Sequence, residues 1–267
     1  MQTGNCWDPG LIRKLNEDSI FSARFELQTQ QGTVEGGLFA VADGMGGHNA
    51  GEVASALAIR SFSAECLSSL LEPVSAPSLT VMADAFNRAN SDVLEAAEDR
   101  ELQGMGTTLT AAVIIGPDMF IAHIGDSRCY IINSRETLQV TRDHSVVQQM
   151  VDEGLITQEQ ARLHPRRNEI TRVLGYSRDA SPDLIHVRLY EGDNIILCSD
   201  GLYSVLPDEK ITELVLGTTD PRQACSDLVG HANLLGGPDN ISIIIVRPDN
   251  LPSWQALVNA HTSIRTG

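Results

Sequence analysis

Residues 38–59 read LFAVADGMGGHNAGEVASALAI and connect an apolar, strand-like run to a helix-like run through a glycine-rich turn. Such turns often bind phosphate, but the spacing matches neither common motif. The dinucleotide motif G-x-G-x-x-G has Asn49 at its last glycine, and the P-loop motif has Glu52 in place of its lysine. Asp43 stands at the mouth of the turn, where a carboxylate repels phosphate and attracts a hard cation. The stretch therefore indicates a loop that binds a metal ion.

The composition is typical of a globular chain. The 267 residues are 42% apolar and 20% charged, and the net charge of −16 opposes binding to nucleic acid or anionic membranes. The five cysteines contain no C-x-x-C pair, and no apolar run approaches the length of a membrane span. We therefore expect reduced thiols, a cytoplasmic location, and no nucleic-acid or membrane partner. No dimerisation seam is evident, so we expect a monomer.

Short segments rich in Val, Ile and Thr predict strands. They cover 19–25, 37–43, 107–114, 119–126, 128–133, 183–189, 193–200 and 240–246. Helical periodicity is clear in 51–71 and 79–101, with a turn predicted at 72–78, and 144–163 and 221–235 also look helical. Several strands are separated only by turns, which favours antiparallel pairing. We therefore predict an α+β fold with helices on the faces of a sheet core. We place the domain at 1–248, followed by a C-terminal tail at 249–267 to which no motif assigns a role.

Carboxylates recur at the ends of the apolar strands. Each one alone is more typical of a turn, because Asp-Gly and Asp-Asn pairs favour loops. Gathered at one edge of a sheet, they would raise one another's pKa, and a divalent cation would relieve that repulsion. Oxygen ligands select Mg²⁺, Mn²⁺ or Ca²⁺ over zinc. The residues concerned are Glu17, Asp18, Asp43, Asp126, Asp200 and Asp239.

Eight stretches, in the same order, resemble the PPM or type 2C family of metal-dependent protein serine/threonine phosphatases. The bacterial single-domain type is the most similar, because the glycine turn reads DGMGGH. The matches cover roughly residues 3–246. They are RKLNED (13–18), AVADGMGGHNAGEVAS (40–55), MGTTLTA (105–111), GDSRCY (125–130), VTRDHS (140–145), ITRVLG (170–175), LCSDGL (197–202) and GPDNIS (237–242).

The resemblance implies a central sandwich of two antiparallel β-sheets flanked on both sides by helix pairs. It also implies two Mn²⁺ or Mg²⁺ ions. By motif match, Asp43 bridges both ions, Asp200 and Asp239 complete the protein ligands of one, and the Gly44 carbonyl binds the other. Glu17 or Asp18 would contact that second ion through water.

Further roles follow from the same resemblance. Asp126 would join Asp200 around a third, weaker ion, and Arg13 would hold the substrate phosphate. His48 is a candidate general acid, although a histidine beside a loop is as often structural. The implied reaction is hydrolysis of phosphoserine or phosphothreonine by direct attack of a hydroxide that bridges the two ions.

Residues 146–169 correspond to the flap beside the active site, which varies within the family. His164, Arg166 and Arg167 are candidate substrate contacts there, and Arg172 extends the basic cluster. The arginines would attract an acidic phosphoprotein segment, and the alternative is an ordinary solvated face.

Two other functions stay open. A phosphatase of small phosphate esters would use the same chemistry. A non-catalytic scaffold that binds a phosphorylated partner would be indicated by a lost metal aspartate, yet every expected position is filled. The expected partners are phosphorylated proteins, and the family implies a cognate serine/threonine kinase and its substrates.

Overall fold

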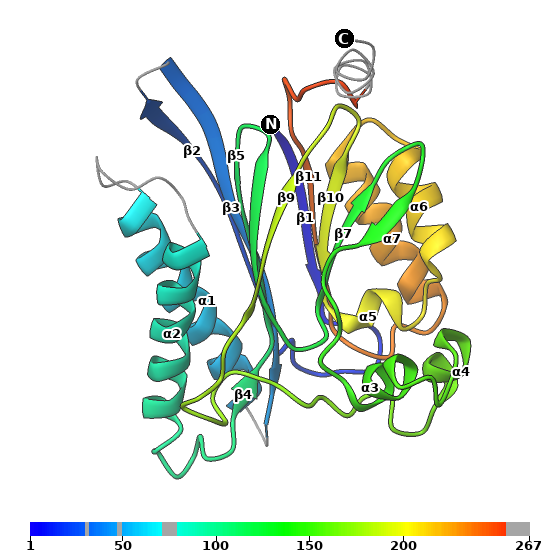
Figure 1. Ribbon diagram of the computed structural model, residues 1–267. Coiled ribbons are helices and arrows are strands. Elements are labelled where there is room, and N and C mark those ends of the chain that lie inside the picture. Colours follow the sequence, from blue (N-terminus) through cyan, green and yellow to red (C-terminus); the bar gives the residue numbers. More distant parts are fainter. Residues whose placement is uncertain (30–31, 47–49, 71–78, 255–267) are drawn as a thin grey trace.

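The computed structural model describes residues 1–29, 32–46, 50–70 and 79–254 (Figure 1). No helix among them is long and apolar enough to cross a bilayer. The strands are β1 (Gln2–Asp8), β2 (Asp18–Thr29), β3 (Gly32–Met45), β4 (Gly106–Thr107), β5 (Leu109–Ile115), β6 (Asp118–Ile124), β7 (Arg128–Ile132), β8 (Thr137–Gln139), β9 (Asp183–Arg188), β10 (Asn194–Cys198) and β11 (Ile241–Arg247). The helices are α1 (Ala50–Leu70), α2 (Leu79–Ala96), α3 (Val146–Asp152), α4 (Gln158–Leu163), α5 (Asp200–Tyr203), α6 (Asp208–Leu216) and α7 (Pro221–Leu234).

These strands form two antiparallel sheets packed face to face. One sheet has the order β1-β11-β10-β7-β8, and the other has the order β2-β3-β5-β6-β9 with β4 paired to β3. Helices α1 and α2 cover the outer face of the second sheet, and α5, α6 and α7 cover the outer face of the first (Figure 1). The predicted sandwich flanked by helices is therefore confirmed.

Alternation along the strands assigns side chains to the layers. In β3, Leu38 and Ala40 pack against the helix pair α1–α2, whereas Phe39 and Val41 point into the core between the two sheets. Successive side chains of a strand point to opposite faces, so a strand that is apolar on both faces belongs in the middle of such a stack. The core between the sheets also contains Ile195, Leu197, Ile244 and Val246 of the opposite sheet.

Several element predictions were wrong or incomplete. β1 was not predicted from the sequence, and it pairs with β11 from Gln2↔Arg247 to Asp8↔Ile241. Helix α6 was not predicted either, and one helix was predicted at 144–163 where α3 and α4 are separate. Each of these two short helices has its own N-cap, since Ser145 and Thr157 accept a backbone hydrogen bond through their side chains. The turn predicted at 72–78 lies outside the described residues.

The first residues of the predicted tail contact the domain. Asp249 forms an ion pair with the amino group of Met1, and the Glu191 amide donates a hydrogen bond to the Pro252 carbonyl. The ring of Trp254 lies edge-on to Tyr190, with centroids 4.8 Å apart. Residues 249–254 therefore pack against the N-terminus and against the segment that connects β9 to β10, and the residues beyond them are not described.

The core between the sheets gives a direct test of the fold. Phe39 is completely buried there, so Phe39→Ala leaves a cavity that two sheets cannot both move to close. We expect a loss of about 3–5 kcal/mol in the free energy of unfolding, measured by denaturant titration with an unchanged slope. Leu138→Ala on exposed β8 is the control and should cost far less. Equal losses in both variants would contradict the assigned core.

Candidate metal centre

The predicted metal residues come from strand ends that meet at one end of the sandwich. Asp18 opens β2 and is the register partner of Asp43 in β3. Asp200 is the first residue of α5, directly after β10, and Asp239 lies just before β11. Asp126 stands in the turn between β6 and β7. The two sheets therefore contribute carboxylates to the same region.

Contacts between these segments bring the carboxylates together. The carboxyl groups of Asp43 and Asp200 are close enough for each to shift the pKa of the other. Ser199 donates a hydrogen bond of 2.7 Å to Asp18 Oδ2, which links the start of β2 to the end of β10. The Gly44 amide donates to the Glu17 carbonyl at 3.1 Å. The charges of Asp18, Asp126, Asp200 and Asp239 all act on the buried Asp43 carboxyl, and that of Asp239 acts on Glu17, so the six predicted acidic residues lie in one region.

Burial and mutual repulsion raise the pKa values of the cluster. Desolvation raises the pKa of Asp43 well above its usual value, and the charges of Asp18 and Asp200 raise it further. Burial also raises the pKa of Asp18 to about 7 and that of Asp200 to about 6. The pKa of Asp126 is raised well above normal, mainly by desolvation. Such a group of carboxylates needs protons or cations to coexist at neutral pH.

The hydrogen bonding of the cluster fits a cation. Four buried carboxylate oxygens have no hydrogen-bond partner in the described structure: Glu17 Oε1, Asp18 Oδ1, Asp126 Oδ1 and Asp200 Oδ1. Buried oxygens are normally paired, and hard divalent cations use oxygen ligands of this type. In the described ranges, no group of three or more His, Cys, Asp or Glu side chains is placed so that it could already hold a metal ion. Water and the Gly44 carbonyl would therefore have to complete any coordination.

Arg13, the candidate phosphate-binding residue, lies beside this cluster. Its guanidinium donates a 2.7 Å hydrogen bond to Asp239 Oδ2, and its side chain is about half exposed. Hydrogen bonding to Asp239 raises the pKa of Arg13, so it stays charged. Arg13 thus places a positive charge at the open side of the carboxylates, where a phosphate could bind.

Asn240 organises the loops that carry these residues. Its side-chain amide donates to the carbonyls of Pro9 and Leu15, and its Oδ1 accepts from the Glu17 amide at 2.8 Å. Its own amide donates to Asp239 Oδ1 at 2.9 Å. One buried side chain therefore fixes the loop of Arg13 and Glu17 against the turn of Asp239.

Gly44 is required by close backbone approach. A Cβ atom at this position would lie 2.0 Å from the Gly51 carbonyl oxygen and 2.5 Å from that of Glu17. Only glycine lets the end of β3 pass between the start of α1 and the Glu17 loop. This packing places the Gly44 peptide beside the carboxylates, consistent with its predicted role as a carbonyl ligand.

A chain of hydroxyl groups from Thr107, Thr108 and Ser127 holds the backbone of Asp43. The amide of Asp43 donates to Thr108 Oγ1 at 2.8 Å, and Thr107 Oγ1 donates to the Asp43 carbonyl at 2.9 Å. Thr108 Oγ1 in turn lies 2.8 Å from Ser127 Oγ, next to Asp126. The sequence predicts Thr107 and Thr108 only as part of a strand at 107–114, because no local pattern reveals the bond between Thr107 and Asp43, which are 64 residues apart.

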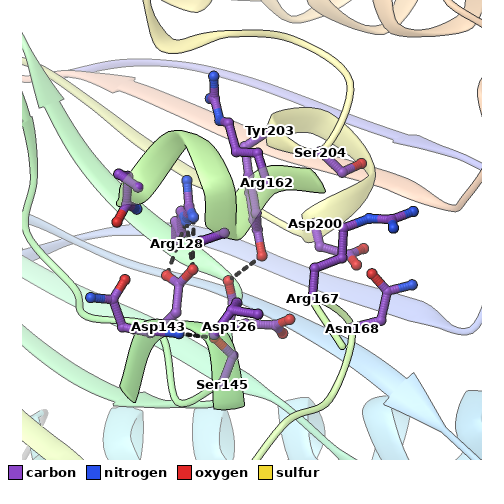
Figure 2. A pocket seen from close by; sticks show the side chains of 14 residues that line it. Asp126, Arg128, Asp143, Ser145, Arg162, Arg167, Asn168, Asp200, Tyr203 and Ser204 are labelled. Carbon is purple, nitrogen blue, oxygen red and sulfur yellow. Dashed lines mark hydrogen bonds and ion pairs between the residues drawn. The ribbon is translucent and has the colours of Figure 1, made fainter. Parts of the chain in front are cut away.

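A buried arginine lies behind Asp126. Arg128 binds Asp143 with two nitrogens, at 3.0 Å and 2.7 Å, and its guanidinium stacks 3.6 Å from the Tyr203 ring centroid. The Tyr203 hydroxyl donates to the Asp126 carbonyl at 2.9 Å (Figure 2). Arg128 therefore fixes Tyr203, and Tyr203 fixes the turn that carries Asp126. The GDSR sequence alone did not indicate this network.

The flap and the carboxylate cluster border one pocket. A cavity of about 70 Å³ lies between α3, α4, α5 and the turn of Asp126, and Figure 2 shows Arg162, Arg167 and Asn168 around it together with Asp200. Arg162 is 3.4 Å from Asp208, whereas the Arg167 side chain has no ion-pair partner in the described part of the chain. Arg167 is thus the least neutralised cation at this pocket.

The other flap candidates lie elsewhere. Arg166 forms an exposed ion pair with Glu169 at 2.7 Å, and His164 Nδ1 accepts a hydrogen bond from the Arg166 amide. Neither side chain lines the pocket. Arg172, which the sequence placed in the same basic cluster, instead pairs with Asp183 at 2.8 Å. The single basic cluster was therefore a wrong interpretation. His48 lies outside the described residues.

Comparison with known proteins identifies the family. A model of the family described as "Protein phosphatase 2C" matches residues 11–241. The chain therefore belongs to the protein phosphatase 2C family, which uses Mn²⁺ or Mg²⁺, and the resemblance read from the sequence is confirmed.

Individual relatives support the same assignment. The chain is 39% identical over 240 residues to the serine/threonine protein phosphatase PstP of Mycobacterium tuberculosis, covering 89% of this chain and 43% of that protein. It spans less than half of that relative. It is 35% identical to the serine/threonine phosphatase stp of Listeria monocytogenes, covering 91% of this chain and 94% of that one. The catalytic domain of PstP has been solved in complex with two manganese ions; it matches with a TM-score of 0.76 at 36% identity, covering 91% of this chain and 96% of that chain.

The unpaired carboxylate oxygens predict a stabilising cation. We expect Mn²⁺ to raise the melting temperature of the metal-free protein. At an Mn²⁺ concentration 100 times the dissociation constant, the gain in the free energy of unfolding is up to about 2.7 kcal/mol. Asp200→Asn removes one carboxylate and is expected to lose most of this shift. Asp84→Asn, an exposed change on α2, is the control and should keep it. An equal shift in both variants, measured by thermal unfolding, would show that Mn²⁺ binds elsewhere.

Proposed function

We propose that the protein is a metal-dependent phosphatase that hydrolyses phosphoserine and phosphothreonine in proteins. The observation that carries the proposal is the cluster of unpartnered buried carboxylates with Arg13 at its open side. A chain of the protein phosphatase 2C family that keeps this set has the groups needed to bind cations and phosphate together. Its protein phosphatase relatives support the substrate class.

The acidic residues and Gly44 would bind the cations. Asp43, Gly44, Asp200 and Asp239 would hold two divalent cations, with Glu17 or Asp18 contacting through water. Asp126 with Asp200 would hold a third. When bound, such cations supply a water nucleophile at neutral pH and neutralise negative charge on the phosphate.

Arg13 would bind and orient the phosphate. The arginine fork matches two phosphate oxygens, and a group already fixed beside the site loses little freedom when substrate arrives. Its bond to Asp239 would be exchanged for bonds to the phosphate, and the Asp239 carboxylate would then bind a cation. The Asn240 bonds hold the loop in place during that exchange.

A first experiment tests the chemistry. We expect hydrolysis of both a phosphothreonine peptide and p-nitrophenyl phosphate with Mn²⁺, and none with chelator. Asp239→Asn is expected to lower kcat/KM by at least about 100-fold, because a charged contact to the reacting centre is lost. Asp84→Asn again serves as the control.

The same assay distinguishes the alternatives. An enzyme of small phosphate esters would hydrolyse an ester far better than any phosphopeptide. A phosphoprotein-binding scaffold would bind metal and keep its fold, yet hydrolyse neither compound.

We also propose that the flap pocket receives acidic residues of the phosphoprotein. The support is Arg167, which lines the pocket without an ion-pair partner in the described structure, beside the polar side chain of Asn168. An acidic side chain near the phosphorylated residue would pair with it at the rim of the active site. The roles of His164 and Arg166 as substrate contacts have less support, because they bond to the flap itself.

Two neighbouring arginines provide a matched pair for this proposal. We expect Arg167→Glu to lower kcat/KM for an acidic phosphopeptide about threefold to tenfold at low salt, and less at high salt because exposed charges are screened. Arg166→Glu makes the same charge change outside the pocket and is expected to have the smaller effect. Equal losses, or none, in steady-state kinetics would refute a specific role for Arg167.

A cognate serine/threonine kinase, a cytoplasmic location and a monomeric state stay predictions. The five cysteines are unpaired thiols, which supports a reducing compartment.

A further inference from the structure

The loop that carries Arg13 is unusually apolar for a surface loop. Leu11 is 63% exposed, Ile12 is 69% exposed and Leu15 is 47% exposed. Single exposed apolar residues are common, but three within five residues, around one functional arginine, form a patch. The loop connects β1 to β2 at the end of the sandwich where the carboxylates gather (Figure 1).

A second segment extends this patch. The end of α7 and the turn that follows it carry Leu234, which is 82% exposed, and Leu235, which is 59% exposed. This turn lies directly against the Arg13 loop, because the Leu11 amide donates a 2.8 Å hydrogen bond to the Gly237 carbonyl. We call these five side chains, Leu11, Ile12, Leu15, Leu234 and Leu235, the apolar rim.

The backbone under the rim is fixed. Gly10 has φ +73°, and a Cβ atom there would lie 2.2 Å from the Asp239 carbonyl oxygen. The Asn240 side chain donates to the Leu15 carbonyl at 2.9 Å. The loop is therefore tied to the metal-site turn at both ends, so its exposed side chains are held in position before a ligand binds. A preformed apolar surface loses little conformational entropy on binding.

Arg13 lies between Ile12 and Leu15, and this position indicates which ligand would cover the apolar rim. A substrate whose phosphate binds Arg13 would bring its neighbouring residues close to Leu11, Ile12 and Leu15, since an extended chain advances only ~3.3 Å per residue. We propose that the apolar rim binds apolar side chains that flank the phosphorylated residue of the substrate polypeptide. This inference rests on the proposed phosphatase function and names the sequence class that the site prefers.

The two sides of the site differ in chemical character. Arg167 lies at the pocket between the flap and Asp200, whereas the rim lies beside Asp239 and the end of α7. A polypeptide that crosses the site would meet a cationic side chain on one side and apolar side chains on the other. Small phosphate esters reach neither, so the rim acts only on polypeptide substrates.

The test compares two phosphothreonine peptides that differ only near the phosphorylated residue. One carries Leu or Ile at the two positions on each side, and the other carries Ser there. We expect the wild-type protein with Mn²⁺ to show kcat/KM about tenfold higher for the apolar peptide, mainly through KM. Leu11→Ser combined with Ile12→Ser is expected to remove this preference, while Leu138→Ser on exposed β8 keeps it.

Turnover of p-nitrophenyl phosphate is measured in parallel, as a substrate too small to reach the rim. Equal turnover of the two peptides by wild type, or a preference that survives the double substitution, would overturn the inference and leave the proposed function standing. No turnover of any phosphopeptide by wild type would overturn both. A dimer that the double substitution disperses, seen by light scattering, with no change in peptide preference, would assign the rim to contact between two copies and also overturn the inference.

Discussion

The repulsion between buried carboxylates is the constraint on which the site depends. Asp18, Asp43, Asp126 and Asp200 all have raised pKa values because the fold removes them from water and places them side by side. An unpaired buried charge is costly, so a chain built only for stability would not gather them. The cost is reduced when cations bind, and this links the energy of the fold to the chemistry of the site. The glycines, the hydroxyl chain and Asn240 all serve to hold these groups close despite the repulsion.

The sandwich achieves this by using strand ends. Apolar strands run through the core, and their polar residues come where the strands leave it, so Asp126, Asp200 and Asp239 reach the edge together. Arg13 and the flap approach the same edge from loops, which vary without disturbing the core. The rigid and variable parts of the site are therefore separate. This separation allows substrate preference to change in the loops while the carboxylate cluster stays fixed.

The sequence predicted much of this arrangement. Strands such as β10 and β11 were evident from their Val and Ile content, and each candidate metal ligand was singled out because it ends or precedes such a run. β1 was missed because its polar residues, Gln2, Thr3 and Asn5, lie on an edge strand that is only partly buried, so no alternation marks it. Whether Arg166 or Arg167 enters the pocket depends on one turn of backbone, which residue type does not reveal. The contacts of Arg128 and Tyr203 join positions 75 residues apart, and no local pattern could indicate them.

The division of the carboxylates between the two sheets has a mechanical consequence. Asp18 and Asp43 belong to one sheet, whereas Asp200 and Asp239 are attached to strands of the other. A cation held between them would act as a clamp across the sandwich, and its affinity would depend on how far apart the sheets pack. The side chains of the middle layer, such as Met119 and Ile244, set that spacing. Substitutions in this layer would then tune metal affinity without changing any carboxylate.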